Sequence, residues 1–371
     1  MATIAPPAPP PLLLPGDHAP WFHAPALSGS PNYAFQTVAG RHIMMLFFGS
    51  TRIEACAAAL RLVLERRAMF DDVNACFFGV TVDREDEAKG HIAQLLPGLR
   101  FFLDYSQDVS RLYGAVGKAG EGNVEYRPHW LLLDPGLRVL DRFPIERGGE
   151  ALDALQRAIA TPAAAEWAPV LEVPNVIEPE LCRELIALYE GEGGTESGFM
   201  RDVDGKTVLI VDAAHKRRSD CMIEDEALKR RIVARMNRRL SPALKKAFQF
   251  EATRIERYLV ACYDASGGYF RPHRDNTTKG TAHRQFAVTI NLNAGDYEGG
   301  DLRFPEYGQR TYRAPTGGAI VFSCSLLHEA TPVTSGRRYA FLPFLYNEEA
   351  ARVRESNNAF LGEGIGEYRI G

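Results

Sequence analysis

The sequence predicts two domains of different architecture, an N-terminal α/β layered sheet and a C-terminal β-sandwich or barrel. The chain has 371 residues, which is enough for two sizeable cores. Its first part alternates strand-like and helical patterns, as layered α/β sheets do. Its last part contains short runs rich in branched and aromatic residues, with glycine turns between them, which is typical of sandwiches and barrels.

The N-terminal part is expected to form the α/β sheet through alternating elements. Continuous apolar runs predict buried strands, and apolar residues at helical spacing predict the helices between them. The turn at Asp134-Pro135-Gly136 separates the last two strands. The predicted strands are residues 42–49, 75–83, 99–105, 130–134 and 138–144, and the predicted helices are residues 54–70, 85–96, 106–116 and 149–160.

Composition divides the chain into four segments. Residues 1–13 are a proline-rich tail, and residues 14–160 form the first domain. Residues 161–169, rich in alanine and proline, are the expected linker, and residues 170–371 form the second domain. Pro179 is suited to the first position of a helix, where its missing N–H is not needed.

The C-terminal domain is expected to contain strands at residues 285–293, 301–305, 319–323 and 339–346, with glycine pairs at 299–300 and 317–318 as turns. Before them, residues 229–246 carry eight basic residues and no acidic one. Apolar residues recur there at helical spacing, which indicates an amphipathic helix lying on a core. A solvated basic face is the favoured interpretation, and an acidic protein or nucleic-acid partner is the alternative.

The most informative pattern is a histidine and a carboxylate two residues apart, His273 and Asp275. Side chains alternate along a β-strand, so these two would share one face. His328, from a later strand, would complete three ligands on one side of a metal. Two histidines and one carboxylate with open positions are the facial triad of non-haem Fe(II) oxygenases. Arg338, expected near the start of a neighbouring strand, offers a planar fork of donors suited to a dicarboxylic cosubstrate.

The surrounding sequence resembles the prolyl hydroxylase family of 2-oxoglutarate/Fe(II) dioxygenases. The resemblance covers about 85 residues and preserves the order and spacing of its motifs. It runs through residues 258–276, 284–293, 298–305, 317–322 and 328–341.

The resemblance implies a double-stranded β-helix of the jelly-roll type with flanking helices. It places the iron ligands at His273, Asp275 and His328, and the salt bridge to 2-oxoglutarate at Arg338. Arg337 competes for that role but is disfavoured, because Arg338 fits the expected start of the final strand. Tyr263 would hydrogen-bond a cosubstrate carboxylate, with an aromatic core residue as the alternative.

Further residues are weaker candidates for this pocket. Thr289 and Asn291 are expected to face it. His283 could approach its mouth, although a solvated histidine at a strand end is favoured, and His215 is the other histidine outside the triad in this half. No separate catalytic residue is predicted.

The activity implied by the resemblance is hydroxylation of a C–H bond with Fe(II) and 2-oxoglutarate, giving succinate and CO2. L-Ascorbate is a candidate further cofactor. A prolyl residue of a peptide or protein is the expected substrate. Two segments, residues 191–217 and 265–268, are rich in glycine and are expected to be mobile loops around the iron.

The N-terminal domain resembles the thioredoxin-like fold of the peroxiredoxin type, on residues 14–20, 44–48, 79–83 and 126–134. Pro128 stands where that fold places a cis-proline. Residues 49–55, where redox families place a cysteine at a helix start, contain none. Cys56 is interpreted as a buried structural cysteine, with a displaced nucleophile as the alternative, and Cys76 as a core residue. A non-catalytic binding module is therefore favoured over a thiol peroxidase.

Several classes of protein are disfavoured by composition. A net charge of −4 indicates no general affinity for nucleic acid. The six cysteines are scattered, which suggests neither disulfides nor zinc and fits the cytoplasm. No apolar run approaches membrane-spanning length, and no signal-peptide pattern is present at the N-terminus. Composition does not predict the oligomeric state.

Overall fold

A computed structural model describes residues 12–116, 125–161 and 166–370. The chain divides into two compact units, one of residues up to Glu166 with Pro305–Gly308, the other of Trp167–Phe304 with the residues from Gln309 onward. The expected linker, residues 161–169, spans this division, and the proline-rich tail lies almost wholly outside the described residues. Across the described ranges, no helix is both long enough and apolar enough to cross a membrane.

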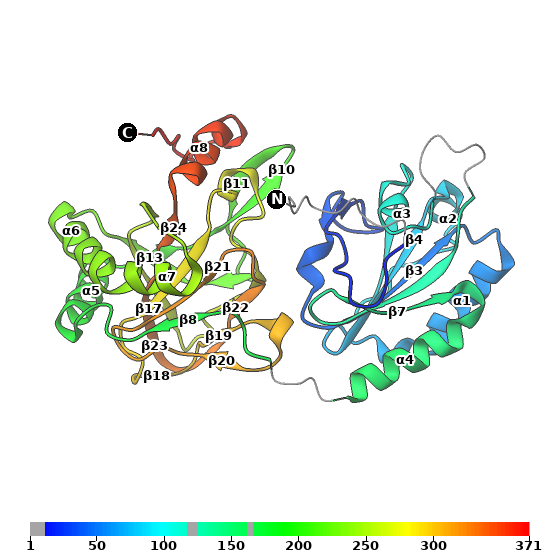
Figure 1. The fold of residues 1–371 in the computed structure, drawn as a ribbon, viewed down its shortest axis with the longest axis horizontal. Helices are drawn as coiled ribbons and strands as arrows, with labels where there is room; N and C mark the ends of the chain where they lie inside the picture. The colour runs from blue at the N-terminus through cyan, green and yellow to red at the C-terminus, as the bar shows by residue number, and fades with distance from the viewer. Residues whose placement is uncertain (1–11, 117–124, 162–165, 371) are drawn as a thin grey trace, which may run out of the picture. The chain divides into compact units, whose positions relative to one another are not determined.

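The first unit is a five-stranded sheet flanked by helices (Figure 1), as expected for an α/β domain. Strand order is β5-β4-β3-β6-β7, with β4 parallel to both β3 and β5 and the remaining pairs antiparallel. A short hairpin, β1 (His23–Ala24) and β2 (Tyr33–Ala34), precedes it. The sheet strands are β3 (His42–Gly49), β4 (Ala75–Thr81), β5 (Leu99–Leu103), β6 (His129–Leu133) and β7 (Val139–Pro144), and the helices are α1 (Glu54–Glu65), α2 (Arg84–Ala88), α3 (Asp108–Leu112) and α4 (Gly148–Ala160).

Three of the four predicted helices of this unit are shorter than expected. The helix predicted at 54–70 is α1, which ends at Glu65 and is followed by a short 3-10 helix, Arg67–Met69. The helix predicted at 85–96 is α2 alone, which Asp83 caps by accepting a hydrogen bond from the Glu85 amide. Gly90 follows it with a φ of 67°, a left-handed conformation that ends helices. The helix predicted at 106–116 is likewise α3 alone, followed by Gly114 with a φ of 74°. The spacing of apolar residues in these last two segments did not reveal that a glycine ends each helix early.

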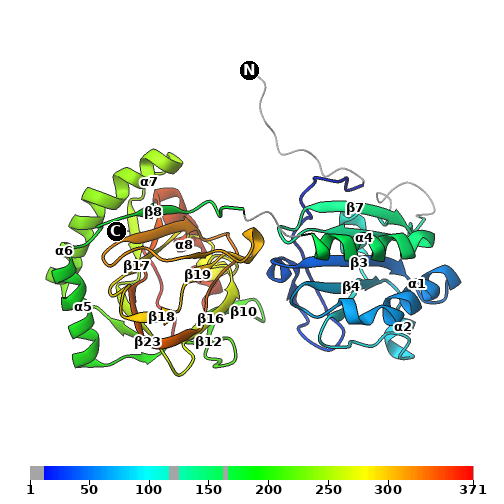
Figure 2. The ribbon, with the colours of Figure 1, turned by 90° about the horizontal axis from the view of Figure 1, so that it is seen from below.

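The two faces of this sheet are covered differently. Helices α1 and α4 pack on one face, where Trp130 and Leu152 are buried (Figure 2). Aromatic side chains cover the other face, with the rings of Phe78 and Phe102 stacked 4.9 Å apart. The sequence left the isomer of the bond before Pro128 open, and the structure has this bond in the trans form; within the described residues the cis bond is Leu96-Pro97.

The second unit is built mainly from two antiparallel sheets, with a separate two-stranded sheet of β10 (Phe199–Val203) and β11 (Lys206–Ile210), and confirms the expectation of a β-rich C-terminal domain. The smaller, five-stranded sheet has the order β12-β16-β22-β19-β20. The larger has β14-β24-β17-β23-β15-β13-β9 as its main path, with β21, β8 and β18 attached. Its strands are β8 (Leu171–Val173), β9 (Thr195–Glu196), β13 (Ser219–Met222), β14 (Arg254–Glu256), β15 (Leu259–Asp264), β17 (Phe286–Asn291), β18 (Tyr297–Gly299), β21 (Ala319–Ser323), β23 (Val333–Phe341) and β24 (Phe344–Tyr346); those of the smaller are β12 (Lys216–Arg217), β16 (Tyr269–His273), β19 (Leu302–Arg303), β20 (Thr311–Tyr312) and β22 (His328–Ala330).

The strand predicted at 339–346 is in fact the end of β23 and all of β24. Pro343 lies between the two strands, and a proline cannot donate a hydrogen bond to a sheet ladder. Strand β23 begins at Val333, earlier than expected, so Arg338 lies well inside it rather than at its start.

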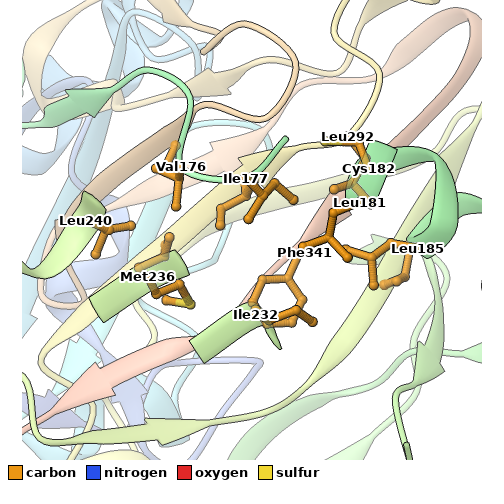
Figure 3. Close-up of a cluster of buried hydrophobic side chains, with 14 of the residues drawn as sticks. Val176, Ile177, Leu181, Cys182, Leu185, Ile232, Met236, Leu240, Leu292 and Phe341 are labelled. Carbon is orange, nitrogen blue, oxygen red and sulfur yellow. The ribbon is translucent and has the colours of Figure 1, made fainter. Parts of the chain in front are cut away.

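Helices cover the outer face of the larger sheet (Figure 2), and Figure 3 shows the hydrophobic side chains buried between these helices and the sheet. The helices are α5 (Pro179–Glu192), α6 (Glu226–Arg235) and α7 (Ser241–Phe248), with a π-helical turn, Met236–Leu240, between the last two; α8 (Glu348–Ser356) lies near the C-terminus. Leu181 and Leu185 of α5 meet Ile232 of α6 above Phe341 of β23. The amphipathic helix predicted over residues 229–246 is confirmed, but as two α-helices joined by the π-turn.

The basic run on these helices is largely paired with acidic side chains. Arg231 bonds both oxygens of Glu184 at 2.7 Å, and Arg235 and Arg239 bond Glu178 at 2.9 and 2.8 Å. This pairing favours the interpretation as a solvated face over a nucleic-acid surface.

Candidate active site

His273 and His328 lie opposite each other on paired strands of the smaller sheet, at the end of β16 and the start of β22. Asp275 follows β16 in a turn and donates its backbone N–H to Cys324. It is therefore not on the strand, and the alternation argument for its direction was wrong. The turn nevertheless brings its carboxylate oxygens to 3.5 Å from His273 Nε2 and 3.3 Å from His328 Nε2.

The three side chains fit a metal ion. One ligand atom from each lies within 4.8 Å of the others. Each histidine donates its Nδ1 hydrogen to a backbone carbonyl, His273 to Arg271 at 2.8 Å and His328 to Leu326 at 3.0 Å. Both Nε2 lone pairs are thereby left for a metal, an arrangement that fixes the tautomer at metal centres.

Electrostatics keep these groups in ligating form. Burial, assisted by the charge of His328, lowers the pKa of His273 to about 4. Burial alone would raise the pKa of Asp275, but the two histidines outweigh it and hold that pKa well below its usual range. A neutral imidazole beside a carboxylate is the protonation state that metal binding requires.

Arg338 and Tyr263 face each other across β23 and β15 and line the same pocket as the triad. The Arg338 guanidinium carbon lies 5.1 Å from the centre of the Tyr263 ring. Arg338 is 2% exposed, and its Nε and Nη1 have no hydrogen-bond partner among the described residues. A buried guanidinium with unpaired donors is what a bound carboxylate would satisfy.

The competing arginine points elsewhere. The Arg337 side chain is 60% exposed and pairs with Glu190 at 3.2 Å. Thr289 lines the pocket. Asn291 does not line it; this buried side chain donates to the Ala314 carbonyl at 2.7 Å.

A buried ionic network that the sequence did not suggest supports the site. Glu256 of β14 accepts hydrogen bonds from Arg284 Nη2 and Nε, at 2.6 and 3.1 Å. His283 Nε2 lies 2.6 Å from the same carboxylate, so this histidine is buried and paired rather than solvated. Arg284 also reaches the backbone carbonyl of Asp275 at 3.5 Å. The network therefore helps hold the turn that carries the third ligand.

Two further arginines, Arg218 and Arg257, line the pocket and were also missed. Arg218 binds the Asp220 carboxylate through Nε and Nη2, both at 2.7 Å. Its Nη1 lies 3.4 Å from the Tyr263 hydroxyl oxygen, which leaves the hydroxyl hydrogen available. Both arginines lie at strand ends outside any recognisable motif, so spacing alone gave no signal for them.

The segment predicted as a mobile loop, residues 191–217, is mostly regular structure. It contains the end of α5, β9, and a hairpin of β10 (Phe199–Val203) and β11 (Lys206–Ile210), followed by β12. Phe199 of this hairpin lies 4.5 Å from the ring centre of His215, which packs on Phe270 at 5.6 Å. Phe270 in turn stacks on His273, with ring centres 3.4 Å apart. The hairpin thus flanks the site.

In the first unit, Thr51 lies in the turn before α1 and donates its hydroxyl to the buried Asp86. Cys56 is the third residue of α1 and is fully buried, and burial followed by the charge of Asp86 raises its pKa to about 11. Cys76 is buried in β4, as expected. A thiol that stays protonated at neutral pH is a poor nucleophile.

We therefore expect no thiol peroxidase activity from this unit. The full-length protein, with iron removed by a chelator, should consume hydrogen peroxide no faster than its Cys56→Ser variant, with dithiothreitol or thioredoxin as reductant. Because the pKa of Cys56 is about 11, its thiolate is scarce below that pH. Rapid peroxide reduction at pH 7 that disappears in Cys56→Ser would contradict this interpretation.

Comparison with known proteins agrees with the geometry. Residues 258–346 match the family model of the 2OG-Fe(II) oxygenase superfamily. The chain is 35% identical over 92 residues to a PKHD-type hydroxylase of Synechococcus sp. (strain JA-2-3B'a(2-13)), which covers 23% of this chain and 41% of that protein. It is 29% identical over 187 residues to a PKHD-type hydroxylase of Shewanella sp. (strain MR-7), which covers 47% of this chain and 77% of that protein.

Solved structures resemble each part of the chain separately. A Pseudomonas putida prolyl-4-hydroxylase aligns with a TM-score of 0.37 and 18% identity, over 48% of this chain and 93% of that one. The peroxidoxin BcpB of Mycobacterium tuberculosis aligns with a TM-score of 0.33 and 17% identity, over 40% of this chain and 99% of that one.

The C-terminal half of the chain contains a 2OG-Fe(II) oxygenase domain, which implies Fe(II) as its metal and 2-oxoglutarate as its cosubstrate.

Proposed function

We propose that the protein is an Fe(II)- and 2-oxoglutarate-dependent dioxygenase that hydroxylates a C–H bond of a prolyl residue in a peptide or protein. The observation that carries this proposal is the convergence of the His273, Asp275 and His328 ligand atoms with the unpaired donors of Arg338 in one pocket. A metal triad and a buried anion-binding group side by side suit a metal-chelating dicarboxylate.

Each residue then has a definite task. His273 and His328 present Nε2 to the metal, and Asp275 supplies the only anionic ligand among them. Arg338 pairs with the distal carboxylate of 2-oxoglutarate, and the hydroxyl of Tyr263 donates to a cosubstrate carboxylate. Phe322 of β21 lies with its ring centre 4.6 Å from that of His328, so apolar side chains shield the metal from water.

The metal and cosubstrate, when bound, supply the oxidation: R–H, O2 and 2-oxoglutarate become R–OH, succinate and CO2. In the overall balance, one oxygen atom of O2 enters the substrate and the other enters succinate. The protein's contribution is to orient and shield the reacting groups.

A peptide substrate is favoured by the surface beside the pocket. Leu209, near the end of the β10–β11 hairpin, is 56% exposed, and Val211, just after the hairpin, is 52% exposed. Exposed apolar side chains next to a reactive centre suit contact with an extended partner chain. The Synechococcus and Shewanella relatives are themselves PKHD-type hydroxylases.

Incubation with proline-containing peptide libraries and, separately, with free proline and small metabolites tests this proposal. We expect succinate formation coupled to a peptide that gains about 16 Da, the mass of one oxygen atom. Succinate formation coupled only to a free small molecule would rule out the peptide substrate, and no succinate with any substrate would contradict the oxygenase assignment.

The remaining parts of the proposal concern the fold of the two units, the location of the protein and a further cofactor. We take the two sheets of the second unit to be a jelly roll, and the first unit to be a thioredoxin-like module that recruits a partner rather than a catalyst. A cytoplasmic location and a role for L-ascorbate remain predictions.

A further inference from the structure

The pocket contains more positive charge than Fe(II) and 2-oxoglutarate account for. Three guanidinium groups line it, those of Arg218, Arg257 and Arg338. They face two carboxylates, Asp275 in the pocket and Asp220 bound to Arg218. Because the two charges of Fe(II) cancel those of 2-oxoglutarate, the loaded pocket keeps one positive charge in excess.

Neighbouring groups do not cancel this excess. Glu256 is neutralised by its contacts with Arg284, as described above. Lys216 is buried behind Phe270 and hydrogen-bonds Ser197 Oγ and the Gly198 carbonyl at 2.7 and 2.6 Å. Lys216 can add only positive charge.

The excess charge is located at Arg257. Arg338 has the cosubstrate to pair with, and Arg218 holds both oxygens of Asp220. Arg257 reaches Asp220 only through Nη2, at 3.4 Å from an oxygen that Arg218 already binds at 2.7 Å. A partly desolvated cation without its own counterion is unfavourable unless an anion joins it.

The backbone directs Arg257 into the pocket. Arg257 has a φ of 72°, a left-handed conformation that non-glycine residues rarely adopt, in the break between β14 and β15. Its neighbour Glu256 pairs with His283 and Arg284, whereas Arg257 lines the pocket beside the triad. Strained backbone held by its surroundings often occurs at ligand-binding positions.

The surface of the strands beside the metal ligands is also basic. Arg217 of β12 and Arg271 of β16 are exposed, and both lie over the ring of Tyr269, at 6.0 and 5.9 Å. Strand β16 carries His273 at its end, so these cations lie on the strands next to the metal ligands. Such a surface attracts anions over a range of about 10 Å at 0.1 M salt.

We propose that the substrate of this oxygenase carries a carboxylate that pairs with Arg257 while the neighbouring C–H bond is hydroxylated. The inference rests on the proposed function and narrows its substrate class. The carboxylate can come from a glutamate or aspartate beside the reactive proline, or from a free carboxylic acid. The exposed Arg217 and Arg271 favour the acidic peptide.

Matched probes distinguish these sources. One peptide library carries proline flanked by glutamate and its twin carries glutamine; the small-molecule pair is N-acetylproline and N-acetylprolinamide. Each is tested with the wild-type protein, Arg257→Gln, Arg257→Lys, and Arg238→Gln as a control on the exposed part of the π-turn. Succinate formation reports turnover, and equilibrium binding of the probes to Zn(II)-substituted protein with 2-oxoglutarate reports affinity without chemistry.

We expect the carboxylate member of a pair to be the better substrate and Arg257→Gln to lower its kcat/KM about 30-fold or more, to the level of the amide member. Arg257→Lys should restore part of the difference, while Arg238→Gln should resemble wild type. Turnover of the neutral probes equal to that of the acidic ones, or indifference to Arg257→Gln, would overturn the inference and leave the proposed function intact.

Absence of turnover with every probe would contradict the prolyl substrate instead. Equilibrium binding of the probes to the Zn(II)-substituted protein then tests the pairing with Arg257 without turnover. Weaker binding of the carboxylate probes to Arg257→Gln supports the pairing, and equal binding to the variant and the wild type refutes it.

Discussion

Replacing His273, His328 or Asp275 by alanine is expected to abolish iron binding and 2-oxoglutarate turnover. The ligand atoms of these three residues lie within 4.8 Å of one another, and both histidines have their tautomer fixed by a backbone carbonyl. Mutating even an outer partner of a metal ligand costs about 10- to 100-fold in affinity or activity. Loss of a ligand should therefore cost at least 100-fold.

The measurement is iron content per chain together with succinate formation in each variant. His91→Ala is a matched control, because His91 is a half-exposed histidine of the first unit, remote in sequence from the triad. Asp275→Ala should be as severe as the histidine variants because it removes the anionic ligand. Normal iron content and turnover in all three variants would place the metal elsewhere.

Arg338→Ala should raise the 2-oxoglutarate concentration needed for turnover far more than Arg337→Ala. Arg338 is buried with unpaired donors, whereas Arg337 is exposed and pairs with Glu190. Truncating one partner of a buried charge pair costs about 2–5 kcal/mol. That cost corresponds to a factor of about 30 or more in affinity.

The KM for 2-oxoglutarate in the two alanine variants measures this difference, and binding of 2-oxoglutarate to the metal-loaded protein checks it independently of chemistry. Arg338→Lys should restore part of the affinity, since it keeps the charge but loses the planar fork. Equal effects at the two positions, or a larger effect at Arg337, would show that Arg338 is not the anchor of the cosubstrate.

The sequence alone predicted those parts of the site that belong to a recognisable motif. The spacing of His273, Asp275 and His328 predicted a metal triad, and the structure brings their ligand atoms together. The reason given for Asp275 was wrong, because its direction comes from a turn held to Cys324 rather than from strand alternation. The choice between Arg338 and Arg337 depended on strand register, which the pairing of β15 with β23 sets.

Other parts of the site depend on tertiary contacts that no local pattern encodes. Glu256 and Arg284 are 28 positions apart and meet only once β14 and the turn before β17 are assembled. Arg257 enters the pocket through a positive φ that its sequence context does not signal. His283, interpreted as a solvated residue, is buried because Glu256 compensates it.

The hydrophobic pattern of the sequence predicted the strands of the fold more accurately than the ends of the helices. Strand β3 and strand β21 coincide with the apolar runs that predicted them. Helix α2 ended early at a left-handed glycine, and Pro343 divided one expected strand into two. Such stops depend on backbone conformations that hydrophobic periodicity does not report.

The most direct test of the central claim is the fate of labelled oxygen. The iron-loaded protein is incubated with 18O2, 2-oxoglutarate and a peptide substrate found in the library screen, and succinate and peptide are analysed by mass spectrometry. The account predicts one 18O atom in succinate and the other in the hydroxylated peptide, in equal amounts. Succinate without label, or a modified peptide without succinate, would contradict it.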